Sequence, residues 1–453
     1  MIEKFMKFFF KILAVIILSL LIFFVGIFKY RQYQANQVSI PRNATSVLKI
    51  SVDEMLKSLA ANMVSNAGFY LKSGDKKKPK DGKSEPGAGL KIPASLYLYS
   101  LEKQPKTAVF TRFEVKSASD FETFIKHTLG FKILKQQHGV SFASSSLGNV
   151  IICYNTEAAA IAFSGEVVNF DAVLIDLLKQ SDFVKLSESK FNKIKKSTHH
   201  IAYSDDNYNF TTDFIAGAIN FNADFSTSAI TPSAKPKHRM LNVGSVVSMW
   251  LNADFPKTST KTYRLKNATL ERDSLLKYYK GYLDFEWTNS IKQTDSIVTY
   301  AYNDDFEKVE KITLQEKNIP NASFIVAADP MGLSTYLSRQ KIINLDSATV
   351  NKSVFPLYKT FVGGNSQYLV LGTKKPGKVD SRNINSTDFF SLAINFKQLN
   401  NQLNIPGLGK YLKHLDRLTV KGKAVDPKQI QLDGKATLVN GDINSLYQLL
   451  KDF

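Results

Sequence analysis

The pattern of hydrophobic and polar residues separates one long apolar run near the start of the chain from a much longer region of short alternating stretches. Residues 8–28, FFFKILAVIILSLLIFFVGIF, are apolar except for Lys11 and Ser19. A helix of this length spans about 31 Å, which matches the hydrocarbon core of a bilayer. Bulky and basic residues follow it, where cleavage of a signal peptide requires small ones. The run therefore predicts an uncleaved transmembrane signal anchor.

Beyond residue 40 the pattern predicts strands interrupted by helices. SVLKISV, residues 46–52, reads as a strand, and residues 53–68 carry apolar positions at helical spacing. KTAVFTRFEVK, residues 106–116, alternates as a half-buried strand does. Four short strands with turn residues between them are expected next, followed by a helix over 171–180. Residues 197–316 read as long strands rich in aromatic and β-branched residues.

A short pattern occurs twice and indicates a possible internal duplication. IPRNATSVLKISVDEMLKSL begins at Ile40, and IPNASFIVAADPMGLSTYL begins at Ile319. Because proline lacks a backbone donor, Pro320 is expected at the entry of a strand, as Pro41 is. Asp329 is expected to cap a helix that begins at the following proline. Both segments should then form a strand followed by a helix.

These expectations combine into an α+β fold class. One N-terminal transmembrane helix precedes mainly antiparallel sheets with packed helices, and the repeated Ile-Pro pattern suggests two related blocks. The predicted parts are a cytoplasmic N-terminus (1–7), a transmembrane signal anchor (8–28), a stalk (29–39), a first α+β block (40–196) with a flexible basic loop (73–87), a β-rich middle (197–316) and a second α+β block (317–453).

Net charge raises the question of nucleic-acid binding, but its distribution argues against that function. The chain of 453 residues carries a formal charge of +19, spread along its length. The one dense cluster, five lysines within residues 76–83, lies among Gly, Pro and Ser, a composition typical of a solvated loop. No nucleic-acid partner is therefore expected. The single cysteine, Cys153, excludes an intramolecular disulfide and is expected to be a buried strand thiol.

No catalytic, cofactor-binding or metal-binding residues are predicted. Six histidines occur without a metal-ligand spacing, and the adjacent pair His199 and His200 would point to opposite faces of a strand. The paired acids in SDDN, residues 204–207, and NDDF, residues 303–306, are interpreted as turns, since neither continues into a calcium loop. No G-x-S-x-G elbow is present. We expect a non-enzymatic protein without a cofactor.

Four stretches carry a resemblance to a known type of protein. They are IPRNATSVLKISVDEML, GYLDFEWTNSIKQTDSIVTYAYNDDFEK, IPNASFIVAADP and LVNGDINSLYQLL. Together with one N-terminal span, they resemble function-unassigned, single-pass-anchored envelope proteins of the Bacteroidota, of the domain-of-unknown-function type. The resemblance implies repeated strand and helix units outside the inner membrane. It covers about a fifth of the chain, and no functional residue is carried over with it.

The sequence thus predicts an uncharacterised envelope protein that faces the periplasm and is held in the inner (cytoplasmic) membrane by residues 8–28. Its expected role is that of a non-enzymatic scaffold or binding protein, with an envelope protein or a lipid as partner. A lipid- or glycan-handling carrier with an apolar groove is the main alternative, because an antiparallel sheet with one apolar face can curl around an acyl chain. An envelope hydrolase is the remaining alternative.

Overall fold

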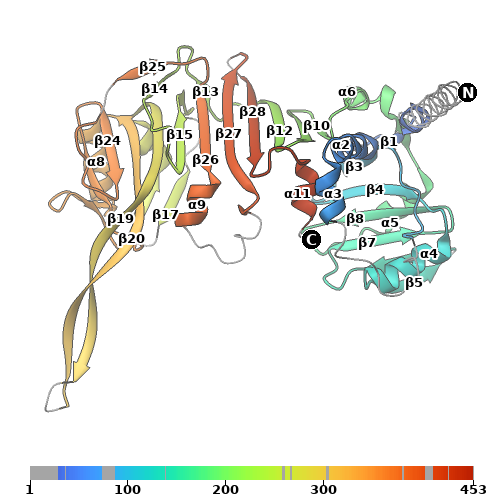
Figure 1. Cartoon of the computed structure of the whole chain (residues 1–453), viewed down its shortest axis with the longest axis horizontal. Helices are drawn as coiled ribbons and strands as arrows, with labels where there is room; N and C mark the ends of the chain where they lie inside the picture. Colours follow the sequence, from blue (N-terminus) through green and yellow to red (C-terminus); the bar gives the residue numbers. More distant parts are fainter. Residues whose placement is uncertain are drawn as a thin grey trace, which may run out of the picture. The chain divides into compact units, whose positions relative to one another are not determined.

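A computed structural model gives the structure of the chain, and its elements are labelled in Figure 1. It describes residues 29–451 except for 36, 74–86, 138, 258–260, 266–267, 303–305, 380–381, 403–411 and 427. The predicted N-terminus and anchor (1–28) and nearly all of the predicted basic loop (73–87) lie outside the described residues. The chain divides into two compact units, residues 1–215 and 216–453, and each is described by itself.

The first unit is built on an antiparallel sheet in which the earliest long strand lies in the interior. Along the sheet the strands follow the order β11-β10-β2-β3-β4-β8-β7-β6-β5. β1 and β9 form a separate antiparallel pair. The strands are β1 (Ser39–Pro41), β2 (Ala44–Ile50), β3 (Leu96–Leu101), β4 (Val109–Glu114), β5 (Lys132–Gln137), β6 (Val140–Ser144), β7 (Val150–Tyr154), β8 (Ala158–Phe163), β9 (Phe183–Lys185), β10 (Ile201–Asp205) and β11 (Tyr208–Ile215).

Helices supply a hydrophobic core on each face of this sheet. Side chains alternate between faces along a strand, so Ala158, Ala160 and Ala162 of β8 face one core, which α5 completes with Leu174. Ala159 lies in the other core, together with Phe121 of α4. The helical segments are α2 (Val52–Ser65), α3 (Ala67–Ser73), α4 (Ala118–Thr123), the π-helical η2 (Phe124–Thr128), α5 (Asp171–Lys179), the 3₁₀ segment η3 (Leu186–Glu188) and α6 (Asn192–Lys195).

The predicted stalk, residues 29–39, packs against the first unit. Residues 29–35 are helical, and Ala35 is buried. Arg31 donates to both carboxylate oxygens of Asp53 in α2, at 2.9 Å each, and to the carbonyl oxygen of Ile92 at 3.2 Å. β1 then pairs with β9, with Ile40 opposite Val184. This segment is therefore packed as part of the first unit and is not a spacer that extends into solvent.

The second unit is also built on an antiparallel sheet, and its first strand pairs with its last. The order is β12-β28-β27-β26-β15-β19-β20-β24-β23-β22-β21. Its strands are β12 (Ala218–Ser226), β15 (Val247–Leu251), β19 (Tyr279–Tyr302), β20 (Lys308–Ala328), β21 (Ile343–Asn344), β22 (Thr349–Val350), β23 (Phe361–Gly364), β24 (Tyr368–Gly372), β26 (Phe390–Asn395), β27 (Leu415–Ala424) and β28 (Gln429–Leu438).

Smaller elements of the second unit accompany this sheet. Three short pairs are β13 (Thr231–Pro232) with β16 (Ala253–Asp254), β14 (Lys237–Arg239) with β25 (Asn383–Asn385), and β17 (Thr262–Leu265) with β18 (Ala268–Glu271). The helices are α7 (Arg272–Leu276), α8 (Pro330–Arg339), α9 (Phe396–Gln402) and α11 (Ser445–Leu450). α8 packs Leu333 and Leu337 into a core with Leu369 of β24, which covers part of one sheet face.

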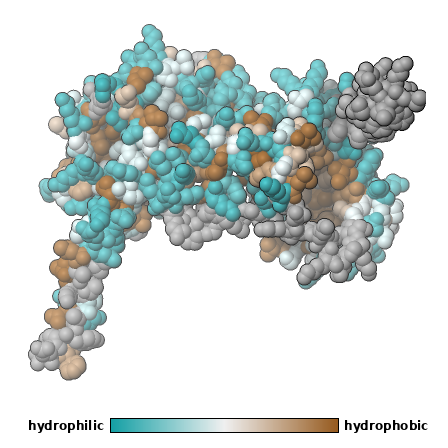
Figure 2. Space-filling view, in the orientation of Figure 1, coloured by the Kyte–Doolittle hydropathy of each residue, from teal (hydrophilic) through white to brown (hydrophobic). Residues whose placement is uncertain are grey.

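A long two-stranded arm extends from the second unit. β19 and β20 remain paired as far as Tyr302 and Lys308, and Figure 1 shows this end running well beyond the neighbouring strands. Apolar side chains on the arm are open to solvent, including Ile312 and Leu314, which are 70% and 72% exposed. Brown, apolar atoms mark the same extension in Figure 2.

The structure corrects the predicted fold class. Strands account for 45% of the chain and helices for 22%, in a mainly antiparallel β architecture and not in α+β blocks. β20 runs through the expected boundary at 316/317, because it stays paired with β19 on both sides of it. Among the described residues, no helix is long and apolar enough to cross a membrane.

The expected duplication also fails at the level of the strands. Ile40 lies in the three-residue β1, whereas Ile319 lies within the 21-residue β20. Pro320 is thus inside a strand and not at its entry. It pairs with Ser290 beside a register shift between Trp287 and Ser290, an irregularity that accommodates a residue without a backbone donor.

Several local predictions are confirmed. Asp329 accepts a hydrogen bond from the backbone N–H of Gly332 and caps α8, with Pro330 at its start. The helix expected over 171–180 is α5, and the four short strands before it are β5 to β8. Cys153 is buried in β7. In these stretches the hydrophobic periodicity, the helix caps and the turn residues all indicate the same element.

Candidate functional site

A cavity of about 610 Å³ opens in the first unit, where four separate segments meet. Its walls come from residues 31–35 and 37–39, from residues 91–97 and Tyr99, from β4 at 112–114 and from the turn at Gln180 and Phe183. We call it the Arg112 cavity. Its volume falls within the range of about 300–1,000 Å³ that is typical of small-molecule sites.

Neighbouring strands bring an arginine and two tyrosines to this cavity. Leu98 pairs with Thr111 and Tyr99 with Phe110, and continuing this register places Tyr97 opposite Arg112. Residues at facing positions on antiparallel strands lie about 5 Å apart at Cβ. Both tyrosines belong to the core beneath α5 and line the cavity as well.

The hydroxyl groups of these tyrosines are buried without a partner. Tyr97 is 5% exposed and Tyr99 is 3% exposed. Neither hydroxyl forms a hydrogen bond within the described part of the chain, although Ser95 lies beside Tyr97. Burial raises the pKa of both phenols well above the ordinary value, and nearby Arg112 opposes that rise for Tyr99. Both are therefore neutral hydroxyls that can donate a hydrogen bond.

In the described part of the chain, the Arg112 side chain has one hydrogen-bond partner. Its Nε donates to the carbonyl oxygen of Leu178, at the end of α5, over 3.2 Å. Within residues 29–451 as described, no carboxylate forms an ion pair with it. Burial lowers its pKa, while the nearby acidic groups, including the carboxylates of Glu114 and Glu157, act in the opposite direction. Since a guanidinium carries five N–H donors, most of the N–H groups of Arg112 remain available to a ligand.

The other charges around the cavity are balanced. Arg31 pairs with Asp53 at 2.9 Å, and Lys91 pairs with Glu114 at 2.8 Å. Arg112 therefore contributes a positive charge that its surroundings only partly offset. Apolar side chains, among them Ile92, Leu96, Phe113 and Phe183, share the walls. The arrangement offers an anion-binding end and an apolar surface in one cavity.

The second unit contains a smaller and more apolar cavity of about 300 Å³. Phe285, Phe324 and Leu371 lie across three neighbouring strands in its lining, facing Phe355 and Tyr358. An apolar small molecule could enter this second cavity as well as the Arg112 cavity.

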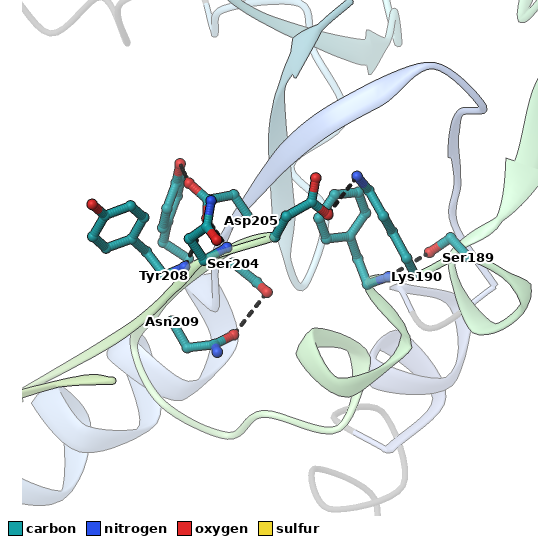
Figure 3. A network of polar contacts seen from close by, with 10 residues as sticks. Ser189, Lys190, Ser204, Asp205, Tyr208 and Asn209 are labelled. Carbon is teal, nitrogen blue, oxygen red and sulfur yellow. Dashed lines mark hydrogen bonds and ion pairs between the residues drawn. The ribbon is translucent and has the colours of Figure 1, made fainter. Parts of the chain in front are cut away.

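The first acid pair singled out in the sequence, in SDDN, does not line the Arg112 cavity. Figure 3 shows the first of them, SDDN, as a turn between β10 and β11. Asp205 accepts hydrogen bonds from the backbone N–H groups of Asn207 and Tyr208 at 2.7 Å each, and Asp206 pairs with Lys190 at 2.7 Å. The turn interpretation is confirmed there. Residues 303–305 of the second pair lie outside the described residues.

The histidines do not form a metal site in the described part of the chain. His199 and His200 separate as expected: His199 lies 2.6 Å from Asp213, and His200 is buried against Phe214. No group of three or more His, Cys, Asp or Glu side chains with the geometry of a metal site occurs among the described residues.

The sequence reasoning missed Arg112, although a signal for it was present. KTAVFTRFEVK was interpreted only as an alternating, half-buried strand, and within it Phe110 is fully buried. Arg112 follows Phe110 at the strand period of two, so it shares the face of a buried aromatic residue. A charged residue at such a position indicates either an internal partner or a ligand.

Comparisons with known proteins add little to this geometry. No family model and no curated protein matches the chain. Among solved structures it is similar to crystal forms III and I of TP0453, each with a TM-score of 0.27 and with 10% and 11% identity; 41% of this chain and 77% and 76% of those chains are covered. Crystal form IV has a TM-score of 0.23 at 9% identity and covers 77% of this chain and 94% of that one. These values are too low to establish a shared fold.

Proposed function

We propose that the chain is a non-enzymatic binding protein of the cell envelope, and that its first unit holds a small molecule in the Arg112 cavity. One observation carries the proposal: Tyr99 lines the cavity, is only 3% exposed, and its buried hydroxyl has no partner in the described residues. A buried polar group left unpaired costs about 1–3 kcal/mol. A bound molecule that supplies the missing partner would remove this cost.

Attachment to the membrane is part of the proposal and rests on the sequence. Residues 8–28 are long and apolar enough for one span, and the cavity wall begins at Arg31, three residues after that run. A span at 8–28 would therefore keep the cavity close to the membrane surface. This placement favours the carrier role over a purely mechanical scaffold.

The binding part of the proposal is tested by extracting the purified full chain. Wild-type protein, Ser39→Trp and Ser353→Trp are extracted with organic solvent, and the extracts are compared by mass spectrometry. Ser39 lines the cavity, so a tryptophan there fills it, whereas Ser353 is exposed in the second unit. We expect one compound in the wild type and the control that is lost from Ser39→Trp. Equal recovery from all three proteins would contradict the proposal.

The anchoring part has its own test. An export-dependent phosphatase is fused after Phe453, and the fusion is compared with one that lacks residues 8–28. Activity in the first and its loss in the second are expected if residues 8–28 place the following chain in the periplasm. A stable but inactive full-length fusion would show that this orientation is wrong.

A further inference from the structure

The arginine and tyrosines at the Arg112 cavity can be compared with a cluster in the second unit in which an arginine and a tyrosine both have a carboxylate partner. In the second unit, Arg239 is 6% exposed and Asp284 is 0% exposed. Arg239 donates to the two carboxylate oxygens of Asp284 at 2.7 and 3.1 Å, and the hydroxyl of Tyr282 donates to the same carboxylate at 2.9 Å. An arginine and a tyrosine thus converge there on one carboxylate.

The Arg112 cavity contains the same two donor types without the carboxylate. Arg112 has unused N–H groups, and the neutral hydroxyls of Tyr97 and Tyr99 are ready to donate. Guanidinium and hydroxyl donors together recognise carboxylate and phosphate oxygens strongly, because the acceptor carries the charge. Space is left for the rest of a ligand, since the cavity measures about 610 Å³ and part of its wall is apolar.

On the basis of the proposed function, we infer that the ligand of the Arg112 cavity is an amphipathic anion. Its carboxylate or phosphate group lies on Arg112 within reach of Tyr99, and its apolar portion lies along Ile92, Leu96 and Phe183. The anion occupies the position that Asp284 occupies beside Arg239. Arg112 selects for the charge of the ligand, and the apolar wall selects for a hydrocarbon portion.

Three probes of equal chain length test this inference: octanoate, octyl phosphate and octanol. Each is added to the full chain in phosphatidylcholine nanodiscs, with empty nanodiscs as blank. Calorimetry measures affinity, and hydrogen exchange of β3 and β4 shows whether the probe is in the cavity. This local readout separates it from the apolar cavity at Phe285 and Phe324. We expect an anion to bind about ten-fold or more tightly than octanol, since hydrogen bonds to charged groups are the stronger kind.

Variants assign that preference to the arginine. Arg112→Gln should bring the anions down to the affinity of octanol, Arg112→Lys should keep part of the preference, and Tyr99→Phe should lower anion affinity several-fold. Arg264→Gln, an exposed position in the second unit, is the matched control and should change nothing. Protection of Cys153 from thiol reagents shows that each first-unit variant is folded, because this only cysteine is buried there.

The outcomes separate the inference from the proposed function. Octanol that protects β3 and β4 as well as the anions do, with no effect of Arg112→Gln, would leave the binding function in place and overturn the inference. No protection of these strands by any of the three probes would overturn both. A preference for octyl phosphate over octanoate points to a phosphate head group, and the reverse preference points to a carboxylate.

Discussion

The two units differ in how they accommodate an arginine that is withdrawn from solvent, fully for Arg239 and partly for Arg112. In the second unit, burial alone would lower the pKa of Arg239, but the hydrogen bond and charge of Asp284 outweigh it and the pKa is raised. In the first unit, burial lowers the pKa of Arg112, and no carboxylate faces it at bonding distance in the described residues. The arginine has a carboxylate partner within the second unit, whereas in the first unit it has none among the described residues.

This difference shows how a structural arginine can be told from one that binds a ligand. A buried ion pair contributes little net stability, but removing one member leaves an uncompensated charge. Arg239 is therefore needed by its own unit, whereas Arg112 can be replaced without leaving a charge behind. Arg239 is buried and Arg112 is half-buried, but it is the carboxylate partner of Arg239 that separates the two roles.

The chain carries a separate probe for each unit, so the comparison can be tested within one molecule. Both tryptophans, Trp250 and Trp287, lie in the second unit, and the single cysteine lies in the first. Tryptophan fluorescence then follows unfolding of the second unit, and pulsed thiol labelling of Cys153 follows unfolding of the first. Each unit therefore has its own unfolding signal.

The largest effect is expected from Arg239→Met. It leaves the fully buried Asp284 without its counter-ion, which should lower the free energy of unfolding of the second unit by about 3–5 kcal/mol. Denaturant titration followed by tryptophan fluorescence measures this loss. Arg264→Met is the exposed control. Adding Asp284→Leu to Arg239→Met should restore much of the stability; a single variant as stable as the control would remove the basis of the comparison.

Tyrosine variants should show the same contrast at a smaller scale. Tyr282→Phe removes a hydrogen bond to a charged carboxylate and leaves the backbone N–H of Arg239 without its acceptor, for a loss of about 1.5–3 kcal/mol. Tyr99→Phe removes a hydroxyl that has no partner, so the first unit should be unchanged or more stable by up to about 1 kcal/mol. Equal losses in the two units would mean that Tyr99 has an internal partner after all.

Arg112→Met should change the first unit little. The variant loses one hydrogen bond, to Leu178, and fills part of the cavity with apolar atoms, so we expect a change within about 1 kcal/mol. Thiol labelling of Cys153 across a denaturant series measures it. A loss as large as that of Arg239→Met would make Arg112 a structural residue and not a ligand-binding one.

Acidification should affect the first unit through one histidine, the smallest of these effects. Burial lowers the pKa of His200, against the opposing charges of Asp213 and Glu54. The folded unit therefore takes up this proton less readily than the unfolded chain. The stability linked to neutral His200 is complete above about pH 6.5, the ordinary histidine pKa, and is lost as pH falls through the lower folded value.

The histidine effect is measured by thiol labelling of Cys153 between neutral and mildly acidic pH. His200→Asn should flatten the pH dependence, because the amide oxygen can accept the hydrogen bond that Phe214 donates to Nδ1. His127→Asn, at an exposed site of the same unit, is the control. An unchanged slope in His200→Asn would assign the pH dependence to other groups.

Local structure was predictable where several local rules agreed. Asp329 followed by Pro330 marks a helix start whatever surrounds it, and the turn residues between β5 and β8 separate strands that pair with their sequence neighbours. Pro320 misled the prediction because a register shift in the partner strand, near Ser290, accommodates it. That partner is chosen by the tertiary fold and cannot be read from the residues next to the proline.

The candidate site was beyond sequence reasoning for the same physical reason. Its walls come from 31–35, 37–39, 91–97, 112–114 and the turn at Gln180 and Phe183, which meet only when β1 pairs with β9 and β3 pairs with β4. No pattern of residue spacing within any one of these segments indicates a cavity. Arg112 was detectable as a charge on an apolar face, but whether it had an internal partner was not.

The strand order has a consequence for how the chain folds. β2 needs β10, and β12 needs β28, so in each unit an early strand pairs with a late one. Pairings between residues so far apart slow folding, because loop-closure entropy is lost before the contacts form. During synthesis the first unit cannot complete its sheet until residue 215 is available, and the second must wait for residue 438. Until then β2 is paired on the β3 side only and β12 lacks its partner β28, and exposed strand edges of this kind are where aggregation begins.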